Sequence, residues 1–226
     1  MDDIILDVRD ISKIYMQGKI PVNALHDVTF SVNKGEFVSI MGPSGSGKST
    51  LMGIVGCLEK PTAGKVIIDG IEVTSISDGQ LPRIRREKIG FVFQHYNLLN
   101  SLTALGNVEL AMRFSKVSRR ERLERAETLL KKLGLGERLN HRPTELSGGE
   151  QQRVSIARAM ANWPAIILAD EPTGEVDSKT RDAIVETFKL LKSRGQTIIV
   201  VTHDPDVAKH CDRVLRIVDG TVVNLD

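Results

Sequence analysis

One segment near the start of the chain constrains the fold more than any other. Residues 42–49 have the form GxxxxGK(S/T) and follow the apolar run Phe37–Met41. When a strand precedes this pattern and a helix follows it, the backbone N–H groups and the helix dipole converge on a phosphate. We expect Lys48 to reach the β- and γ-phosphates of a nucleotide, and the Ser49 hydroxyl to ligate Mg²⁺. The predicted nucleotide contacts are Gly42, Pro43, Ser44, Gly45, Ser46, Gly47, Lys48, Ser49 and Thr50.

Length and composition are those of an ordinary globular protein. The chain has 226 residues, of which 41% are hydrophobic and 27% charged, enough for one large domain or a core carrying a smaller one. A net charge of +2 and an aromatic share of 4% disfavour a nucleic-acid surface. No apolar run approaches the roughly 18 residues that span a bilayer, so we expect no direct membrane insertion. Cys57 and Cys211 match no metal spacing, which predicts free thiols in a reducing compartment.

The pattern of apolar residues predicts an α/β fold. Continuous apolar runs at Phe37–Met41, Ile166–Ala169 and Ile198–Val201 are typical of parallel strands buried on both faces. In the first third, closely spaced strands joined by Asn33-Lys34-Gly35 and Asp69-Gly70 predict an antiparallel hairpin layer. Residues 1–94 and 158–226 would form a P-loop NTPase core with a mixed sheet and this layer, and residues 95–157 an inserted α-helical subdomain. The predicted helices of the insert are Leu102–Met112, Arg119–Leu133 and Gln151–Asn162.

A pair of acids predicts the second half of a nucleotide site. The apolar strand that begins at Ala165 ends in Asp170 and Glu171. Asp170 at the strand end can hold the Mg²⁺ shell opposite Ser49. Glu171, one residue further, can orient and polarise an attacking water as a general base.

A second anion-binding turn precedes another predicted helix. The segment Leu146–Arg153 reads LSGGEQQR, in which a Ser-Gly-Gly turn leads directly into an apolar-periodic helix. One chain thus carries two such turns and only one lysine-bearing phosphate loop. If Ser147, Gly148 and Gly149 cap a nucleotide that another copy of the chain holds, a two-site dimer follows.

These motifs together resemble the ATP-binding cassette (ABC) family over essentially the whole chain. LSGGE followed by QQRV, the phosphate loop and the strand that ends in Asp-Glu occur in the family's order. No long coiled coil separates them, unlike in the chromosome-maintenance and repair members. The resemblance implies that Gln94 contacts Mg²⁺ or the attacking water, and that His203 touches the γ-phosphate. It also implies that Asp177 crosses the dimer interface, although Val176 stands where the family usually has Leu.

Two further positions are less typical of the family. The resemblance implies that Tyr15 stacks on adenine, the alternative being an exposed loop tyrosine without a ligand. Glu150 replaces the commoner Gln at the end of the signature, so no ribose contact is assigned to it.

The resemblance implies a nucleotide-binding subunit that hydrolyses ATP for an ABC transporter. Two copies would clamp two ATP molecules head to tail, and a separate integral membrane permease would contact the region Gln94–Ala104. The segments Gly42–Thr50, Lys88–Gln94 and Leu146–Arg158 resemble the MacB/LolD type, which serves export of macrolides, peptides or haem, or release of lipoproteins. The implied location is cytoplasmic, on the inner face of the membrane through the permease.

Two other functions stay open from the sequence. A closely similar cell-division ATPase pulls on a membrane partner to regulate cell-wall hydrolysis, and only the partner distinguishes it from a transporter. A soluble ABC ATPase of DNA repair or translation is disfavoured by the single cassette, the net charge of +2 and the two cysteines.

Overall fold

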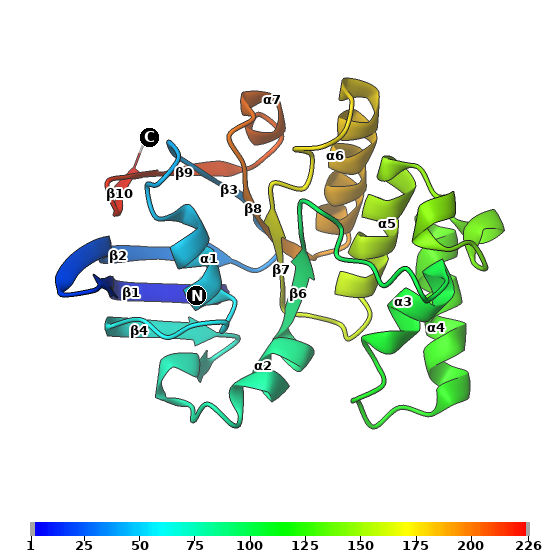
Figure 1. Cartoon of the computed structure of the whole chain (residues 1–226), viewed down its shortest axis with the longest axis horizontal. Helices are drawn as coiled ribbons and strands as arrows, with labels where there is room; N and C mark the ends of the chain where they lie inside the picture. The colour runs from blue at the N-terminus through cyan, green and yellow to red at the C-terminus, as the bar shows by residue number, and fades with distance from the viewer. Residues whose placement is uncertain (1–2, 225–226) are drawn as a thin grey trace.

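A computed structural model describes residues 3–224. Two β-sheets lie next to each other with helix α1 (Lys48–Val55) between them, and most other helices cover the far face of the larger sheet (Figure 1). The predicted fold class, α/β with a mixed sheet, an antiparallel layer and helices, is confirmed. No helix among residues 3–224 combines the length and apolarity needed to cross a membrane.

The antiparallel layer is the smaller sheet, with strand order β2-β1-β4-β5. The prediction that Asn33-Lys34-Gly35 joins two of its strands is wrong, because this turn carries the chain out of the layer and into the larger sheet. The turn between β1 and β2 lies instead at Gly18 and Lys19, where Gly18 has a φ of +64°. Asp69-Gly70 does join two antiparallel strands, as predicted. The strands are β1 (Ile4–Gln17), β2 (Ile20–Asn33), β4 (Ala63–Ile68) and β5 (Ile71–Glu72).

The larger sheet has the strand order β10-β9-β3-β8-β7-β6. Five of its strands run parallel and the edge strand β10 pairs antiparallel with β9. The carboxyl ends of β3, β7 and β8 therefore meet at one edge, which is where ligands bind in open α/β sheets. The strands are β3 (Phe37–Met41), β6 (Ile89–Val92), β7 (Ile166–Asp170), β8 (Thr197–Val201), β9 (Arg213–Val218) and β10 (Thr221–Asn224).

The parallel strands are buried on both faces, as their continuous apolar sequences predict. In β8, Ile199 and Val201 face the core between the two sheets, whereas Ile198 and Val200 face the core under the helices. Strand β7 alternates in the same way, because successive side chains of a strand point to opposite faces. The alternation of side chains along β7 and β8 therefore decides which apolar residues belong to which of the two cores.

Of the three helices of the predicted insert, α3 and α4 are shorter than the sequence suggests, and α5 has the predicted length but a shifted start. They pack through Val108, Leu130 and Ile156, which belong to the core under the larger sheet. Helix α5 begins three residues earlier than predicted, because Ser147 caps it. The remaining helices complete the list, which is α2 (Leu81–Lys88), α3 (Ala104–Leu110), α4 (Arg119–Lys132), α5 (Gly148–Ala159), α6 (Ser178–Ser193) and α7 (Pro205–Ala208).

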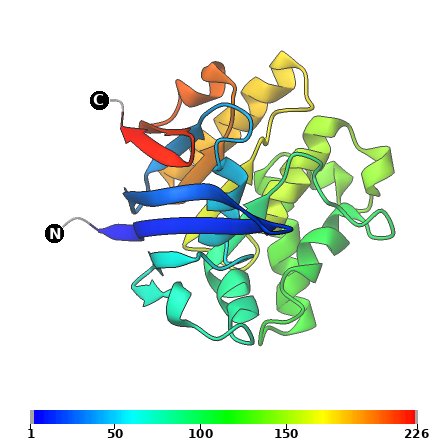
Figure 2. The same cartoon turned by 60° about the vertical axis from the view of Figure 1, so that its left-hand side comes forward.

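The two sheets meet at a corner formed by β2 and β10, which Figure 2 shows from the side. The His26 N–H donates to the Gly220 carbonyl at 2.8 Å. It lies two residues from Ala24, whose carbonyl oxygen contacts Gly47 in the turn that precedes α1.

Candidate nucleotide site

The phosphate loop follows β3 and depends on glycine for its shape. Gly45 and Gly47 have φ angles of +78° and +102°, which side chains rarely adopt. A Cβ on Gly47 would lie 2.5 Å from the Ala24 carbonyl oxygen, and one on Gly42 would lie 2.1 Å from the Ile217 carbonyl oxygen. The loop is therefore clamped between β2 and β9, and its backbone leaves no space for Cβ atoms at these positions.

Helix α1 presents an uncapped N-terminus at this loop. Its N-cap is Gly47, which offers no side-chain hydrogen bond, and the first turn carries no acid. Lys48 Nζ donates to the carbonyl oxygens of Gly42 at 2.8 Å and Pro43 at 2.7 Å. An ammonium group has three donors, so one remains for a ligand. Uncapped N–H groups, the helix dipole and this cation all favour an anion.

Two acids and a histidine face the loop from the ends of β7 and β8. Asp170, Glu171 and His203 line the same cavity as Lys48, with a volume of about 590 Å³. His203 Nδ1 lies 2.8 Å from Glu171 Oε1. Glu171 has a φ of +43°, a strained conformation for a residue with a side chain, and its N–H donates to the Val201 carbonyl at 2.9 Å. That bond between β7 and β8 holds the carboxylate against His203.

The charges in the cavity perturb each other. Burial and then the neighbouring Glu171 carboxylate raise the pKa of Asp170, while Lys48 acts in the opposite direction. The hydrogen bond that the His203 ring donates to the Glu171 carboxylate, and the charge of that carboxylate, raise the pKa of His203. Two adjacent carboxylates of which one is half-buried are a site that a cation would stabilise.

The groups present fit a nucleotide with a divalent cation. Backbone N–H groups and Lys48 suit phosphate oxygens, while the Ser49 hydroxyl and the Asp170 carboxylate are oxygen ligands. No cluster of three or more His, Cys, Asp or Glu side chains able to hold a metal occurs among residues 3–224. A cation here would take few ligands from the protein and the rest from phosphates and water, which is usual for Mg²⁺.

The Ser-Gly-Gly turn lies outside this cavity and beside Asp177. Ser147 caps α5 by accepting from the Glu150 N–H, and the Glu150 carboxylate accepts in return from the Ser147 N–H at 2.8 Å. A Cβ on Gly149 would lie 2.5 Å from Thr180 Cγ2, so the turn packs directly on the first turn of α6. The chain therefore holds two separate groups of predicted site residues.

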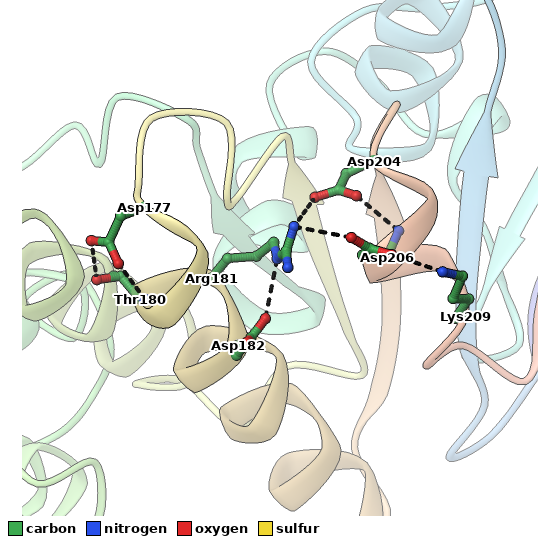
Figure 3. A network of polar contacts seen from close by, with 7 residues as sticks. All are labelled: Asp177, Thr180, Arg181, Asp182, Asp204, Asp206 and Lys209. Carbon is green, nitrogen blue, oxygen red and sulfur yellow. Dashed lines mark hydrogen bonds and ion pairs between the residues drawn. The ribbon is translucent and has the colours of Figure 1, made fainter.

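Asp177 caps α6, as Figure 3 shows. Its carboxylate accepts from the Thr180 hydroxyl at 2.7 Å and the Thr180 N–H at 3.0 Å, and these bonds lower the pKa of Asp177. One helical turn further, Arg181 Nη1 lies 3.3 Å from Asp204, the residue after His203. Helix α6 thus connects the Asp177 turn to the loop that carries His203, through the ion pair of Arg181 with Asp204 (Figure 3).

Gln94 and Tyr15 do not line the cavity. Gln94 packs against Gly174, where a Cβ would lie 3.2 Å from its Nε2 atom. The Tyr15 hydroxyl donates to Glu59 Oε2 at 2.6 Å, and the Lys13 ammonium lies 5.0 Å from the ring centroid. Burial and the bond to Glu59 raise the pKa of Tyr15, whereas the Thr50 hydroxyl acts in the opposite direction.

Sequence reasoning missed two side chains of α5 that bind the loops after Gln94 and Glu171. Gln152 is fully buried in α5, and its Nε2 donates to the Pro172 carbonyl at 2.6 Å and to the Phe93 carbonyl at 3.4 Å. Arg158, one and a half turns along α5, donates to the carbonyls of Tyr96 and Asn97. The signal that could have revealed Gln152 is its place on the apolar face of an otherwise amphipathic helix.

Comparisons with known proteins agree with these motifs. Residues 25–174 match the family model described as ABC transporter. The chain is 52% identical to an uncharacterized ABC transporter ATP-binding protein of Thermotoga maritima, over 98% of this chain and 95% of that protein. It is 48% identical to the macrolide export ATP-binding/permease protein MacB of a Shewanella species, over 99% of this chain and 34% of MacB. The chain thus spans about a third of MacB.

Solved structures show the same fold. A dimeric, post-hydrolysis structure of the ATP-binding cassette MJ0796 bound to ADP and Pi superposes with a TM-score of 0.86, at 49% identity and 96% coverage of both chains. The chain belongs to the ABC transporter family. It is an ABC-type ATPase, as the resemblance implied, with MacB-type ATP-binding proteins among its relatives.

Proposed function

We propose that two copies of this chain close head to tail around two ATP molecules. Each ATP would lie between the phosphate loop of one copy and the Ser147–Gly149 turn of the other. The observation that carries this proposal is the separation of the two groups within one chain, since Ser147–Gly149 contributes nothing to the cavity that Lys48 lines. The dimeric cassette bound to ADP and Pi, at 49% identity, supports the same arrangement.

Within this site we assign roles by position and chemistry. Lys48 and the N–H groups of residues 44–50 would bind phosphates, and Mg²⁺ would be held by Ser49 and Asp170. Gln94, which lies outside the cavity in this structure, would join these ligands only when the site closes on the nucleotide. Mg²⁺ when bound neutralises charge on the phosphate chain.

Glu171 is assigned as the general base, and its strained backbone and its contact with His203 fix where its carboxylate points. His203 would meet the γ-phosphate, because it lines the same cavity as Lys48 and the phosphate loop. Asp177 would cross the dimer interface from beside the Ser147 turn. Tyr15 would stack on adenine with the ring face that Lys13 leaves uncovered.

We further propose that helix α5 transmits the state of the nucleotide. It is capped by Ser147, and it is hydrogen-bonded through Gln152 to the loop after Glu171 and through Arg158 to the loop after Gln94. We treat residues 1–94 and 158–226 as the core and 95–157 as the helical subdomain, with residues 1, 2, 225 and 226 outside the described range. Closure on ATP and opening after hydrolysis would then move these two parts relative to each other.

We propose that a separate membrane permease of the MacB/LolD type docks beside the joint between the two parts, by which we mean α5 and the two loops that Gln152 and Arg158 bind. A groove of about 670 Å³ exposes Leu58 and Phe114, which are 57% and 76% exposed, next to Phe91 and Asn97. Large exposed apolar side chains gathered in a groove are typical of an interaction site. Of the sequence region Gln94–Ala104, only Asn97 lines this groove, so most of the docking surface would come from β6, α2 and the C-terminal ends of α3 and α5. This coupling would place the ATPase on the cytoplasmic face of the membrane and drive export or extraction of a substrate that the permease selects.

The experiment follows from the two-copy site. Glu171→Gln, which removes the base and keeps the shape, should run as a dimer with Mg-ATP in size-exclusion chromatography and as a monomer without it. Ser147→Arg in the same background should bind ATP as a monomer, because Ser147 acts on the nucleotide of the partner. A Glu171→Gln protein that stays monomeric in saturating Mg-ATP would refute the proposal.

A further inference from the structure

A second groove lies beside the proposed permease site. It has a volume of about 1070 Å³, and its lining includes residues of α2, α4 and the turn between α6 and β8. Arg86, Phe114 and Asn162 line both grooves, so the two surfaces are continuous. We call this surface the arginine groove, after the basic residues that line it, which are Arg83, Arg86, Lys116, Arg125, Lys132 and Arg194.

The arginine groove carries an excess of positive charge. Six basic residues line it against three acids, Glu87, Glu121 and Glu124. Two of these acids are already paired, Glu87 with Arg83 at 3.0 Å and Glu124 with an arginine outside the groove at 2.7 Å. Within residues 3–224, Lys116, Lys132 and Arg194 form no ion pair. The chain as a whole has a net charge of only +2, so this excess is local.

Two arginines in the groove have unused hydrogen-bond donors. The Arg86 side chain forms no hydrogen bond among residues 3–224 and only one ion pair, in which its Nη2 lies 3.6 Å from Glu87. Arg125 donates one hydrogen bond, to the Met160 carbonyl at 3.2 Å, although a guanidinium group carries five donors. Burial without an anionic partner lowers the pKa of Arg125 to about 10. Both groups therefore lack acceptors that a carboxylate would supply.

The groove also displays the single tryptophan of the chain. Trp163 is 78% exposed and has a φ of +55°, a strained conformation for a bulky residue. The Arg125 guanidinium lies 3.4 Å from the Trp163 ring centroid and holds the ring at the groove. Met112 and Met160 line the same groove. An apolar and aromatic surface beside unpaired cations is suited to a peptide that carries both carboxylates and apolar side chains.

We propose that the arginine groove binds an acidic segment of the membrane partner, so that one permease chain occupies both grooves. This inference rests on the proposed docking of a permease at Leu58 and Phe114. A polypeptide fits better than a lipid headgroup, because the cations lie on α2, on α4 with the loop before it, and on the turn after α6. A single headgroup reaches one of these elements, whereas an extended chain rising about 3.3 Å per residue can pass all three.

Site-specific photo-crosslinking in membranes of the native host tests this. Benzoylphenylalanine replaces Thr128, an exposed residue of the arginine groove, or Leu58 in the first groove, and mass spectrometry maps each adduct. We expect both positions to label the same integral membrane protein, with the Thr128 adduct on a segment rich in Asp and Glu. Arg86→Gln with Arg125→Gln should lower the Thr128 adduct at least about tenfold, since charge-assisted hydrogen bonds are lost. The Leu58 adduct should remain.

The control variant is Arg119→Gln, which removes a cation from the same helix α4 outside the groove and should change neither adduct. A Thr128 adduct on lipid or on an uncharged segment would overturn the inference, as would no adduct at Thr128 while Leu58 still labels the permease. Those outcomes leave the proposed function intact. If Leu58 labels no membrane protein either, the permease docking fails together with the inference. The mapping does not depend on the arginine variants folding well.

Discussion

Two glycines of the phosphate loop, Gly45 and Gly47, together with Gly79 in the turn before α2, separate the cost of backbone conformation from the cost of steric overlap. The strain expected on adding a Cβ increases from Gly79 to Gly45 to Gly47. Gly79 has ordinary backbone angles and no atom within 4 Å of the added Cβ, whereas Gly45 has open space but a φ of +78°. Gly47 has both a φ of +102° and the Ala24 carbonyl oxygen at 2.5 Å. Substituting each glycine by Ala therefore adds one cost at a time.

The expected magnitudes follow from these geometries. Gly79→Ala should leave stability unchanged or raise it by up to about 1 kcal/mol, because Ala has fewer conformations in the unfolded chain. Gly45→Ala should cost about 1–2 kcal/mol, the penalty of a left-handed residue with a Cβ. Gly47→Ala adds overpacking of about 1–3 kcal/mol, for a total of about 2–5 kcal/mol. The contact with the Ala24 carbonyl is to backbone, which cannot rotate away.

Thermal unfolding followed by circular dichroism measures the series. For a domain of this size each kcal/mol shifts Tm by about 2–4 °C, so Gly45→Ala should fall by about 2–8 °C and Gly47→Ala by about 4–20 °C. Gly47→Ala should also lose the rise in Tm on adding Mg-ATP, because its loop no longer closes on a phosphate. Equal Tm values for the Gly45 and Gly47 variants would show that β2 does not clamp the loop, and the reasoning would be wrong.

Three further changes probe the rest of the site. Lys48→Ala should abolish the binding of a fluorescent ATP analogue, and an unchanged Kd would contradict the loop assignment. Because the folded pKa of His203 is raised by Glu171, their ion pair stabilises the fold fully below a pH of about 6.5 and is lost as pH rises through the raised value. The Tm difference between wild type and His203→Gln should thus be larger at acidic than at alkaline pH, whereas a constant difference would disprove the pairing. Gln152→Met leaves the Pro172 carbonyl without its buried donor, a cost of about 1–3 kcal/mol, and should lower kcat more than KM; unchanged kcat would remove Gln152 from the proposed joint.

The sequence predicted the sheets well because their signal is local. Continuous apolar runs such as Ile198–Val201 are required wherever a strand is covered on both faces, and β8 has these bounds almost unchanged. The turn at Asn33-Lys34-Gly35 was misread because a glycine turn has the same composition whether the next strand returns to the same sheet or leaves it. Which of these happens depends on where Phe37 and its neighbours find a covered position, and that is a property of the whole fold.

The candidate site also has parts that the local sequence determines and parts that depend on the whole fold. A contiguous motif fixes the phosphate loop, and the strand that ends in Asp170 and Glu171 fixes the acids, so the sequence by itself determined both. Only the tertiary structure decided that His203 would meet Glu171, that the Ser147 turn would lie apart from Lys48, and that Gln152 would join two loops. These contacts link residues far apart in the chain through single polar atoms, and no residue pattern encodes them. Packing of α5 against the larger sheet buries Gln152 beside the carbonyls of Phe93 and Pro172, and a buried donor is paired with the acceptors that the fold brings within reach.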